Sequence, residues 1–403
     1  MKKRYLTSKE VTEALQITPA TLYAYVSRGL IRSETSPDDP RQRRYLAEDV
    51  QRLLERKAQR QDPSQAVQQK VQQALHWGAP VMDSALTLIT NGELYYRGQR
   101  VSALAQSAGF EDVCGLLWLD DMEAGERLFA ESQPVSSLMP IETPTASALI
   151  RMQIALAASA EADLQAFDHS PQNVARIGVR IIQHMIRSAT SAPINPGMTV
   201  AEAVAQGWDA DITPLINAAL ILCADHELNV SAFTARAIAS ADASPYQAVI
   251  GALAALQGYR HGGATQRVDT MLQVFEAAPD RLTAMRRWLQ GGQTLAGFGH
   301  HLYPEGDVRA GVLLDLLDRH VNQHPALDLA AQVIDFASQT VGQHPNVDFA
   351  LVVLQRAFEL QADVALTLFA LGRTAGWIAH IIEQYEVDTM IRPRATYTGR
   401  LPS

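Results

Sequence analysis

Two histidines and one aspartate in the last third of the chain could together do chemistry on a carbonyl compound. His261, His300 and Asp348 each lie in a short segment rich in glycine, proline or asparagine. Such segments form turns and let a ligand approach the backbone closely. A carboxylate can remove a proton next to a carbonyl if hydrogen-bond donors stabilise the enolate oxygen that develops. The three residues therefore predict a site that makes a carbon–carbon bond at an enolised carbon.

Each of these residues also has a simpler explanation, and the residues alone leave both open. Asp348 precedes the apolar run 349–353 and could be the N-cap of a helix. His261 could close a helix C-terminus, where the helix dipole favours a histidine. His300 could be a solvated loop residue, and the adjacent His301 is a rival candidate for its role.

Three arginines could bind a dicarboxylate, because a guanidinium meets a carboxylate with two parallel hydrogen bonds. Arg309 follows an aspartate by two residues, Arg373 is expected to open an apolar helix, and Arg392 precedes a proline near the C-terminus. The alternative for any one of them is a surface ion pair.

Six segments resemble motifs of the citrate synthases, in the same order and at similar separations. They are residues 226–231, 258–264, 297–309, 345–348, 372–377 and 392–399. The resemblance extends from about residue 83 to residue 399. It implies an all-α body with a large and a small helical domain that close over the substrate. It also implies a homodimer, possible higher oligomers, and active sites shared between subunits.

The resemblance also implies a role for each candidate. In a Si-type citrate synthase the residue matching Asp348 takes the methyl proton of acetyl-CoA. The match to His261 donates to the enol oxygen, and the match to His300 polarises the ketone of oxaloacetate. His226, Arg309 and Arg373 resemble oxaloacetate ligands, and Arg392 resembles an arginine that reaches the partner subunit's site. Acetyl-CoA is then a substrate, and we expect neither a bound cofactor nor a metal.

Some residues depart from the family pattern. A valine, Val308, stands where the family usually has proline between the aspartate and Arg309. Residues 350–352 are more apolar than usual, and such a wall would suit a larger acyl group. A 2-methylcitrate synthase that uses propionyl-CoA is therefore an alternative.

The first 60 residues are predicted to be a separate, basic unit. They hold 13 Lys and Arg against 8 Asp and Glu, a net charge of +5, so the formal −9 of the whole chain leaves −14 for the rest. Thr7 to Glu10 has the pattern of a capping box, and Thr18 is expected to cap a second helix that ends before Gly29. A third helix is expected over about residues 47–59.

Residues 5–57 resemble the winged helix-turn-helix of MerR-type regulators. The resemblance implies DNA binding by a helix in the major groove and by arginines of the wing. The candidate DNA contacts are Thr21, Tyr23, Arg28, Arg41, Arg43 and Arg44. A protein-docking or vestigial unit is the alternative, since a net charge of +5 is modest. A further alternative for the whole chain is a metabolite-sensing regulator whose body only binds ligands.

We expect the winged helix-turn-helix at residues 1–60, a linker at 61–78 and the body at 79–403, with the small domain at roughly 235–345. Asn91-Gly92 joins two runs rich in β-formers and predicts a hairpin, the one clear sheet element. Elsewhere helical periodicity dominates.

Composition indicates an intracellular globular protein. The chain has only two cysteines, in apolar surroundings, and its first residues lack the apolar core of a signal peptide. The apolar runs around residues 215–223 and 248–256 are too short to cross a bilayer. We therefore expect a cytoplasmic protein without a membrane partner.

Overall fold

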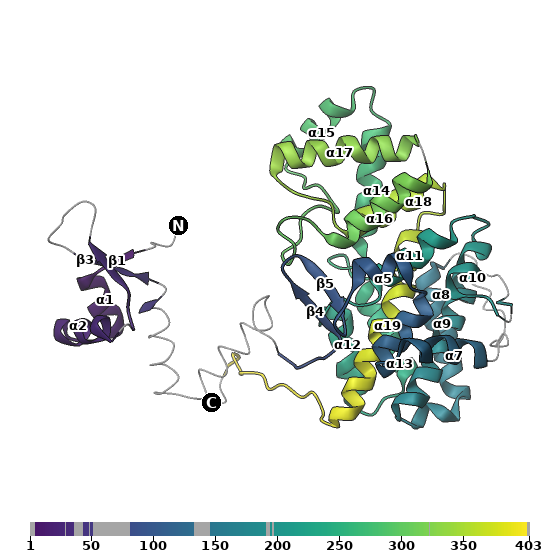
Figure 1. Ribbon diagram of the computed structural model, residues 1–403, viewed down its shortest axis with the longest axis horizontal. Coiled ribbons are helices and arrows are strands. Elements are labelled where there is room, and N and C mark those ends of the chain that lie inside the picture. Colours follow the sequence, from purple (N-terminus) through teal and green to yellow (C-terminus); the bar gives the residue numbers. More distant parts are fainter. Residues whose placement is uncertain are drawn as a thin grey trace. The chain divides into compact units, whose positions relative to one another are not determined.

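The computed structural model describes residues 5–28, 30–35, 43–47, 49–50, 81–132, 146–190, 194–195, 197–321 and 323–400. The chain divides into two compact units, Met1–Asp83 and Ser84–Ser403 (Figure 1). The described residues are largely helical, so the predicted all-α fold with a small N-terminal helix-turn-helix unit is confirmed.

The N-terminal unit combines two short helices with a three-stranded antiparallel sheet of order β1-β3-β2. Its elements are β1 (Tyr5–Thr7), α1 (Ser8–Leu15), α2 (Pro19–Ser27), β2 (Ser33–Thr35) and β3 (Arg43–Leu46). This sheet corrects our expectation that the Asn91-Gly92 hairpin is the one clear sheet element. Strands of three or four residues that carry serine, threonine, glutamate and arginine do not show the alternation by which strands are recognised.

The helix starts of this unit follow the predicted capping chemistry. Thr7 and Glu10 form a reciprocal capping box at α1, and the Thr18 side chain accepts the amide of Thr21 at α2. The two helices and the sheet enclose a small core of Val11, Leu15, Leu22, Ile31, Tyr45 and Val50. Gly29, the linker at 61–78 and most of the predicted third helix lie outside the described residues.

The second unit begins with the predicted hairpin. It consists of β4 (Thr87–Thr90) and β5 (Glu93–Tyr96), extended by β6 (Gln99–Arg100). Asn91 and Gly92 both have positive φ, 51° and 76°, as a two-residue turn of this kind requires.

The other regular elements described in this unit are helices. The first group comprises α5 (Val101–Ser107), α6 (Phe110–Leu119), α7 (Met122–Glu131), α8 (Ala148–Ala162), α9 (Pro171–Thr190), α10 (Val200–Gly207), α11 (Thr213–Cys223), α12 (Val230–Ala239) and α13 (Pro245–Leu256), with the 3-10 helix η1 (Leu164–Phe167). The second group comprises α14 (Gly263–Glu276), α15 (Arg281–Gln290), α16 (Val308–His320), α17 (Pro325–Val341) and α18 (Val347–Ala357). Figure 1 shows this second group gathered on one side of the unit.

The last helix, α19 (Val364–Val387), connects the two groups. It packs against α9, α11, α12 and α13 of the first group and against α14 and α18 of the second. It is longer than the two apolar runs named from the sequence, and by length and composition alone it could cross a membrane. However, 94% of its most apolar window is buried inside the unit, as in the core helix of a globular fold.

Candidate active site

Backbone hydrogen bonds hold two of the predicted catalytic loops against each other. The amide of Gly299 donates to the carbonyl of His344, and the amide of Asn346 donates to the carbonyl of Gly297, both at 2.8 Å. The loop that ends at His300 is thereby paired with the loop that leads into α18.

Glycine is required at Gly297 because of both its conformation and its surroundings. Its φ is +78°, and a Cβ there would lie 2.7 Å from the side chain of Val268 and 2.9 Å from Cβ of Phe349. A side chain would therefore push α14 and α18 away from the loop.

Asp348 is the second residue of α18 and does not cap it. The cap is Asn346, whose Oδ1 accepts the amides of Asp348 at 3.1 Å and of Phe349 at 3.4 Å. Among the described residues the Asp348 carboxylate has no hydrogen-bond partner. Burial raises the pKa of Asp348 to about 6, an effect that Arg309 opposes and Asp307 reinforces. The side chain is thus an unpaired carboxylate whose pKa suits a general base.

The surroundings of His300 determine which ring nitrogen carries its proton. Its Nδ1 accepts the amide of Leu302 at 3.2 Å, so this nitrogen is unprotonated. Burial, with the nearby Arg309, lowers the pKa of His300 to about 4. The ring is therefore neutral at pH 7, and Nε2 holds the one N–H that it can donate to a ligand.

His226 and Tyr303 lie beside His300. The rings of His226 and His300 are 5.1 Å apart, and Nε2 of His226 is 3.1 Å from the hydroxyl of Tyr303. Burial, followed by the charge of Arg309, keeps the pKa of His226 well below its usual value. This wall of the site therefore presents neutral, hydrogen-bonding rings.

Arg309 is buried and held by Asp307. Its Nε and Nη2 donate to the two carboxylate oxygens of Asp307 at 2.9 and 2.8 Å. Its Cζ also lies 5.7 Å from the centroid of the Tyr303 ring. The geometry fixes one edge of the guanidinium, as a residue prepared for an anionic ligand requires.

Arg373 is 1% exposed and projects from the middle of α19, which corrects the expectation that it opens a helix. Its Nε donates to the carbonyl of Cys223 at 2.7 Å, and its Cζ lies 4.7 Å from the centroid of the Phe369 ring. Within the described part of the chain its guanidinium makes no other hydrogen bond and no ion pair within 4.0 Å. Arg373 is thus a buried cation with donors left for a ligand.

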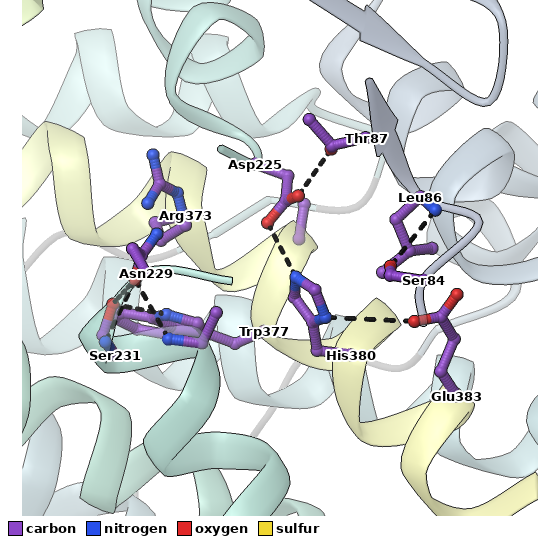
Figure 2. A network of polar contacts seen from close by, with 12 residues as sticks. Ser84, Leu86, Thr87, Asp225, Asn229, Ser231, Arg373, Trp377, His380 and Glu383 are labelled. Carbon is purple, nitrogen blue, oxygen red and sulfur yellow. Dashed lines mark hydrogen bonds and ion pairs between the residues drawn. The ribbon is translucent and has the colours of Figure 1, made fainter. Parts of the chain in front are cut away.

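His261 lies in the turn between α13 and α14, where a hydroxyl orients it. Its Nε2 is 3.0 Å from Oγ of Ser231. The same Oγ accepts the indole N–H of Trp377 at 3.1 Å (Figure 2). The Ser231 proton has two acceptors within reach, His261 Nε2 and Asn229 Oδ1, the latter at 2.7 Å. When the Ser231 hydroxyl donates to Nε2 of His261, the imidazole carries its own proton on Nδ1. That N–H then points away from Ser231.

Electrostatics connects His261 to the rest of the site. Burial lowers the pKa of His261 to about 4, and Arg373 contributes to the shift. The charge of Arg373 also acts on the pKa of Asp348 and of His226. The structure thus brings six of the seven predicted residues of the body together.

Arg392 is the exception. It is exposed, on the segment that follows α19, and makes no hydrogen bond or ion pair with the described residues. Within one subunit it is therefore not part of the cluster.

Comparison with known proteins places this site in a family. The family model described as "Citrate synthase, C-terminal domain" matches residues 74–394. The chain belongs to the citrate synthase family. A second model, "Helix-turn-helix domain", matches residues 5–58 and does not specify the MerR type.

Individual members of the citrate synthase family resemble the chain over most of its length. "Citrate synthase 2" of Bacillus subtilis is 27% identical and covers 80% of this chain and 94% of its own. "2-methylcitrate synthase 2" of Corynebacterium glutamicum is 28% identical and covers 76% and 88%. A solved citrate synthase of Thermoplasma acidophilum, a ternary complex with carboxymethyl coenzyme A and oxaloacetate, is 24% identical, covers 81% and 95%, and has a TM-score of 0.68.

Sequence reasoning gave no role to several residues that shape the site. Asp307, Tyr303 and Ser231 lie next to or within the motifs, but each acts on another side chain rather than as a predicted reactive group. Only the Asp-x-Arg spacing at the start of α16 offered a signal, because an N-cap aspartate can reach the arginine two residues later. In the described ranges, no three His, Cys, Asp or Glu side chains form a group that could hold a metal.

The candidate DNA contacts of the N-terminal unit differ in how accessible they are. Tyr23 on α2 is 62% exposed, and Arg28 just after this helix is also exposed. Thr21 is partly buried, and its hydroxyl lies 2.9 Å from that of Thr18, so it serves the start of α2.

The two candidate arginines of β3, Arg43 and Arg44, are partly engaged. Arg43 donates to Oγ of Ser33 at 3.3 Å. Arg44 forms an ion pair with Glu34 and stacks over the Tyr5 ring, 4.2 Å from its centroid. Arg41 lies outside the described residues.

Proposed function

We propose that the body condenses the methyl carbon of acetyl-CoA with the ketone of oxaloacetate, giving citrate and free coenzyme A. The observation that carries this proposal is the combination of an unpaired carboxylate of pKa about 6 with two neutral histidines. A base that is ionised at pH 7 and donors that remain uncharged are what an enolisation needs.

The first step is removal of a methyl proton of the thioester by the Asp348 carboxylate. The developing enolate oxygen receives a hydrogen bond from Nδ1–H of His261, in the state in which the Ser231 hydroxyl donates to Nε2 of His261 rather than to Asn229. Both groups are held on helix ends or packed turns, so little reorganisation is needed when the charge develops.

The second step is attack of the enol carbon on the ketone carbon of oxaloacetate. Nε2–H of His300 is the donor that polarises the ketone and protonates the alkoxide. Arg309 and Arg373 hold the substrate carboxylates, and His226 lies against the same ligand. Water then cleaves the thioester of the condensed product, so one thiol is released for each citrate formed.

A 2-methylcitrate synthase acting on propionyl-CoA is the runner-up, and the likeness to the Corynebacterium protein supports it. The apolar residues that suggested a larger acyl pocket, Ala350, Leu351 and Val352, are each at most 1% exposed and belong to the core around α18. Their apolar character is therefore accounted for by packing and gives no reason to expect a larger acyl pocket.

Thiol release measured with each acyl donor in turn tests the proposed reaction. We expect release that requires oxaloacetate, with kcat/KM higher for acetyl-CoA than for propionyl-CoA. A higher value for propionyl-CoA would make the chain a methylcitrate synthase. No release with either donor, from protein that binds oxaloacetate, would leave the metabolite-sensing regulator as the better function.

We also propose that two subunits associate and share their active sites. Arg392 is exposed and apart from the cluster, while α8 carries the exposed apolar side chains of Ile150 and Ile154. An exposed apolar face on a core helix is typical of an interface with another subunit.

A second function, DNA binding by the N-terminal unit, is supported by the exposed Tyr23 and Arg28 and by the match to a helix-turn-helix model. Selection of bound duplexes from a random-sequence pool would provide a probe for fluorescence anisotropy. We expect affinity to fall steeply with salt and Tyr23→Ala to weaken it, whereas Glu13→Ala on the exposed side of α1 should not. Enrichment of no sequence, with weak binding that Tyr23→Ala leaves unchanged, would favour a docking or vestigial unit.

A further inference from the structure

Asp225 is fully buried directly before the substrate-binding candidate His226, and two side chains hold its carboxylate (Figure 2). Thr87 on β4 donates its hydroxyl to Oδ2 at 2.5 Å. Oδ1 faces Nε2 of His380 at 3.3 Å, a close contact that lacks the alignment of a hydrogen bond. The carboxylate is thus held between the hairpin and α19.

His380 lies between two carboxylates. Its Nδ1 is 4.0 Å from Oε2 of Glu383, one turn further along α19, and the imidazole is fully buried. Glu383 is itself committed, because its Oε1 accepts the amide of Ala85 at 2.8 Å and its Oε2 accepts Nη1 of Arg236 at 3.0 Å. Glu383 is therefore fixed on one side of His380, and the buried imidazole lies between Glu383 and Asp225.

Gly376 makes this arrangement possible. A Cβ at this position would lie 2.4 Å from the carbonyl of Ala224 and 2.4 Å from Oδ1 of Asp225. The amide of Gly376 also donates to the Ala224 carbonyl at 2.9 Å. Asp225 can therefore lie directly against α19, within reach of His380 but also in the field of Arg373, one turn earlier.

Arg373 and Asp225 are both buried, yet no ion pair within 4.0 Å joins them. A buried carboxylate and a buried guanidinium attract strongly, and each would be stabilised by pairing with the other. Here Arg373 instead places only its Nε on a backbone carbonyl, that of Cys223. The Asp225 carboxylate must therefore be kept from moving to Arg373. The side chains that face its two oxygens are Thr87 and His380.

We propose that His380 is a positioning residue that holds the Asp225 carboxylate away from Arg373 and so keeps Arg373 free to bind a carboxylate of the substrate. His380 acts through Asp225 and touches no substrate itself. This inference rests on the proposed function, in which Arg373 is an oxaloacetate ligand.

Direct oxaloacetate binding, measured by calorimetry on the full-length protein without acyl-CoA, tests the proposal. We expect His380→Gln to raise the dissociation constant by about tenfold or more, because Asp225 is then free to capture Arg373. At saturating oxaloacetate we expect kcat to stay within about threefold of wild type, because the reacting groups are untouched. The matched control His320→Gln, on the exposed end of α16, should bind as wild type does.

A second substitution separates positioning from mere packing. Adding Asp225→Asn to His380→Gln removes the charge that captures Arg373, so we expect the affinity to return to within about threefold of wild type. A loss caused only by disturbed packing would not be rescued by a second change in the core. Thr87→Val releases Asp225 from the other side and should raise the dissociation constant in the same way, again with rescue by Asp225→Asn.

The outcomes distinguish this inference from the proposed function. Unchanged oxaloacetate affinity in His380→Gln and Thr87→Val, or a loss that Asp225→Asn does not rescue, would overturn the role of His380 and leave the function standing. Wild-type protein that binds no oxaloacetate would overturn the proposed function and this inference with it.

Discussion

The carboxylate of Asp307 clamps the guanidinium of Arg309 with two hydrogen bonds, of 2.9 and 2.8 Å, and both side chains are buried. The same carboxylate accepts the amide of Val347 at 3.0 Å, where α18 begins. One side chain thus connects Arg309, the proposed ligand of oxaloacetate, to the helix that carries the proposed base, Asp348.

Replacing Asp307 should damage both substrate affinity and stability. In Asp307→Asn the buried Arg309 loses its charged partner, so we expect the KM for oxaloacetate to rise at least about tenfold and stability to fall by about 2–4 kcal/mol. Steady-state kinetics and denaturant unfolding would measure the two effects. Asp318→Asn, at an exposed position of α16, is the matched control. An unchanged KM would show that the clamp does not orient Arg309.

The dependence of the rate on pH should report Asp348. Burial raises the pKa of this carboxyl to about 6, whereas those of His261 and His300 are lowered to about 4. The base must be ionised to act, so kcat/KM for the acyl-CoA should rise with pH and level off above about 6. The histidines remain neutral throughout this range. A profile without a limb between pH 5 and 7, or one that falls as pH rises through 6, would contradict this assignment.

The same shift predicts that the proposed base destabilises the fold. The folded-state pKa of Asp348 lies above its ordinary value of 3.8, so the ionised form is disfavoured by folding. The cost is absent below about pH 4, develops between about pH 4 and 6, and is complete above 6. Asp348→Asn should therefore gain up to about 3 kcal/mol at pH 8 and gain little at pH 4. Measuring the free energy of unfolding of wild type and Asp348→Asn at pH 4 and pH 8 would test this gain. Equal stability of the two proteins at pH 8 would contradict it.

If the active sites are shared between subunits, a hybrid dimer of two different inactive variants should regain activity. If Arg392 completes the partner's site, Asp348→Asn and Arg392→Ala subunits each form inactive or impaired homodimers. A hybrid contains one site with Asp348 from one subunit and Arg392 from the other. Co-expression with two different affinity tags would isolate this hybrid. We expect about half of the wild-type activity per hybrid dimer, and activity no higher than that of the better homodimer would contradict shared sites.

Sequence patterns predicted the elements whose signals are local. The Asn91-Gly92 hairpin and the caps at Thr7 and Thr18 depend on a few adjacent residues, and the structure has all three. The helical character of the body likewise followed from the period of its apolar residues.

What the sequence did not reveal depends on contacts between distant segments. The pairing of Gly299 with His344, and the contact of Asp225 with His380, join positions 45 and 155 residues apart. No periodicity or cap announces such contacts, although they decide which side chains remain available for a ligand. The sequence also could not distinguish a reactive role of a candidate residue from a purely structural one, because that depends on the side chains around it. Asp348 is available for chemistry because Asn346, not Asp348, caps α18.

The most direct measurement is oxaloacetate-dependent thiol release from acetyl-CoA by wild type, Asp348→Asn and the matched Asp315→Asn on the exposed side of α16. We expect wild type and Asp315→Asn to turn over equally, and Asp348→Asn to lose about 100-fold or more of kcat while still binding oxaloacetate. Wild-type turnover that survives in Asp348→Asn would contradict the assignment of Asp348 as the base. No turnover by wild type with either acyl donor would contradict the proposed condensation itself.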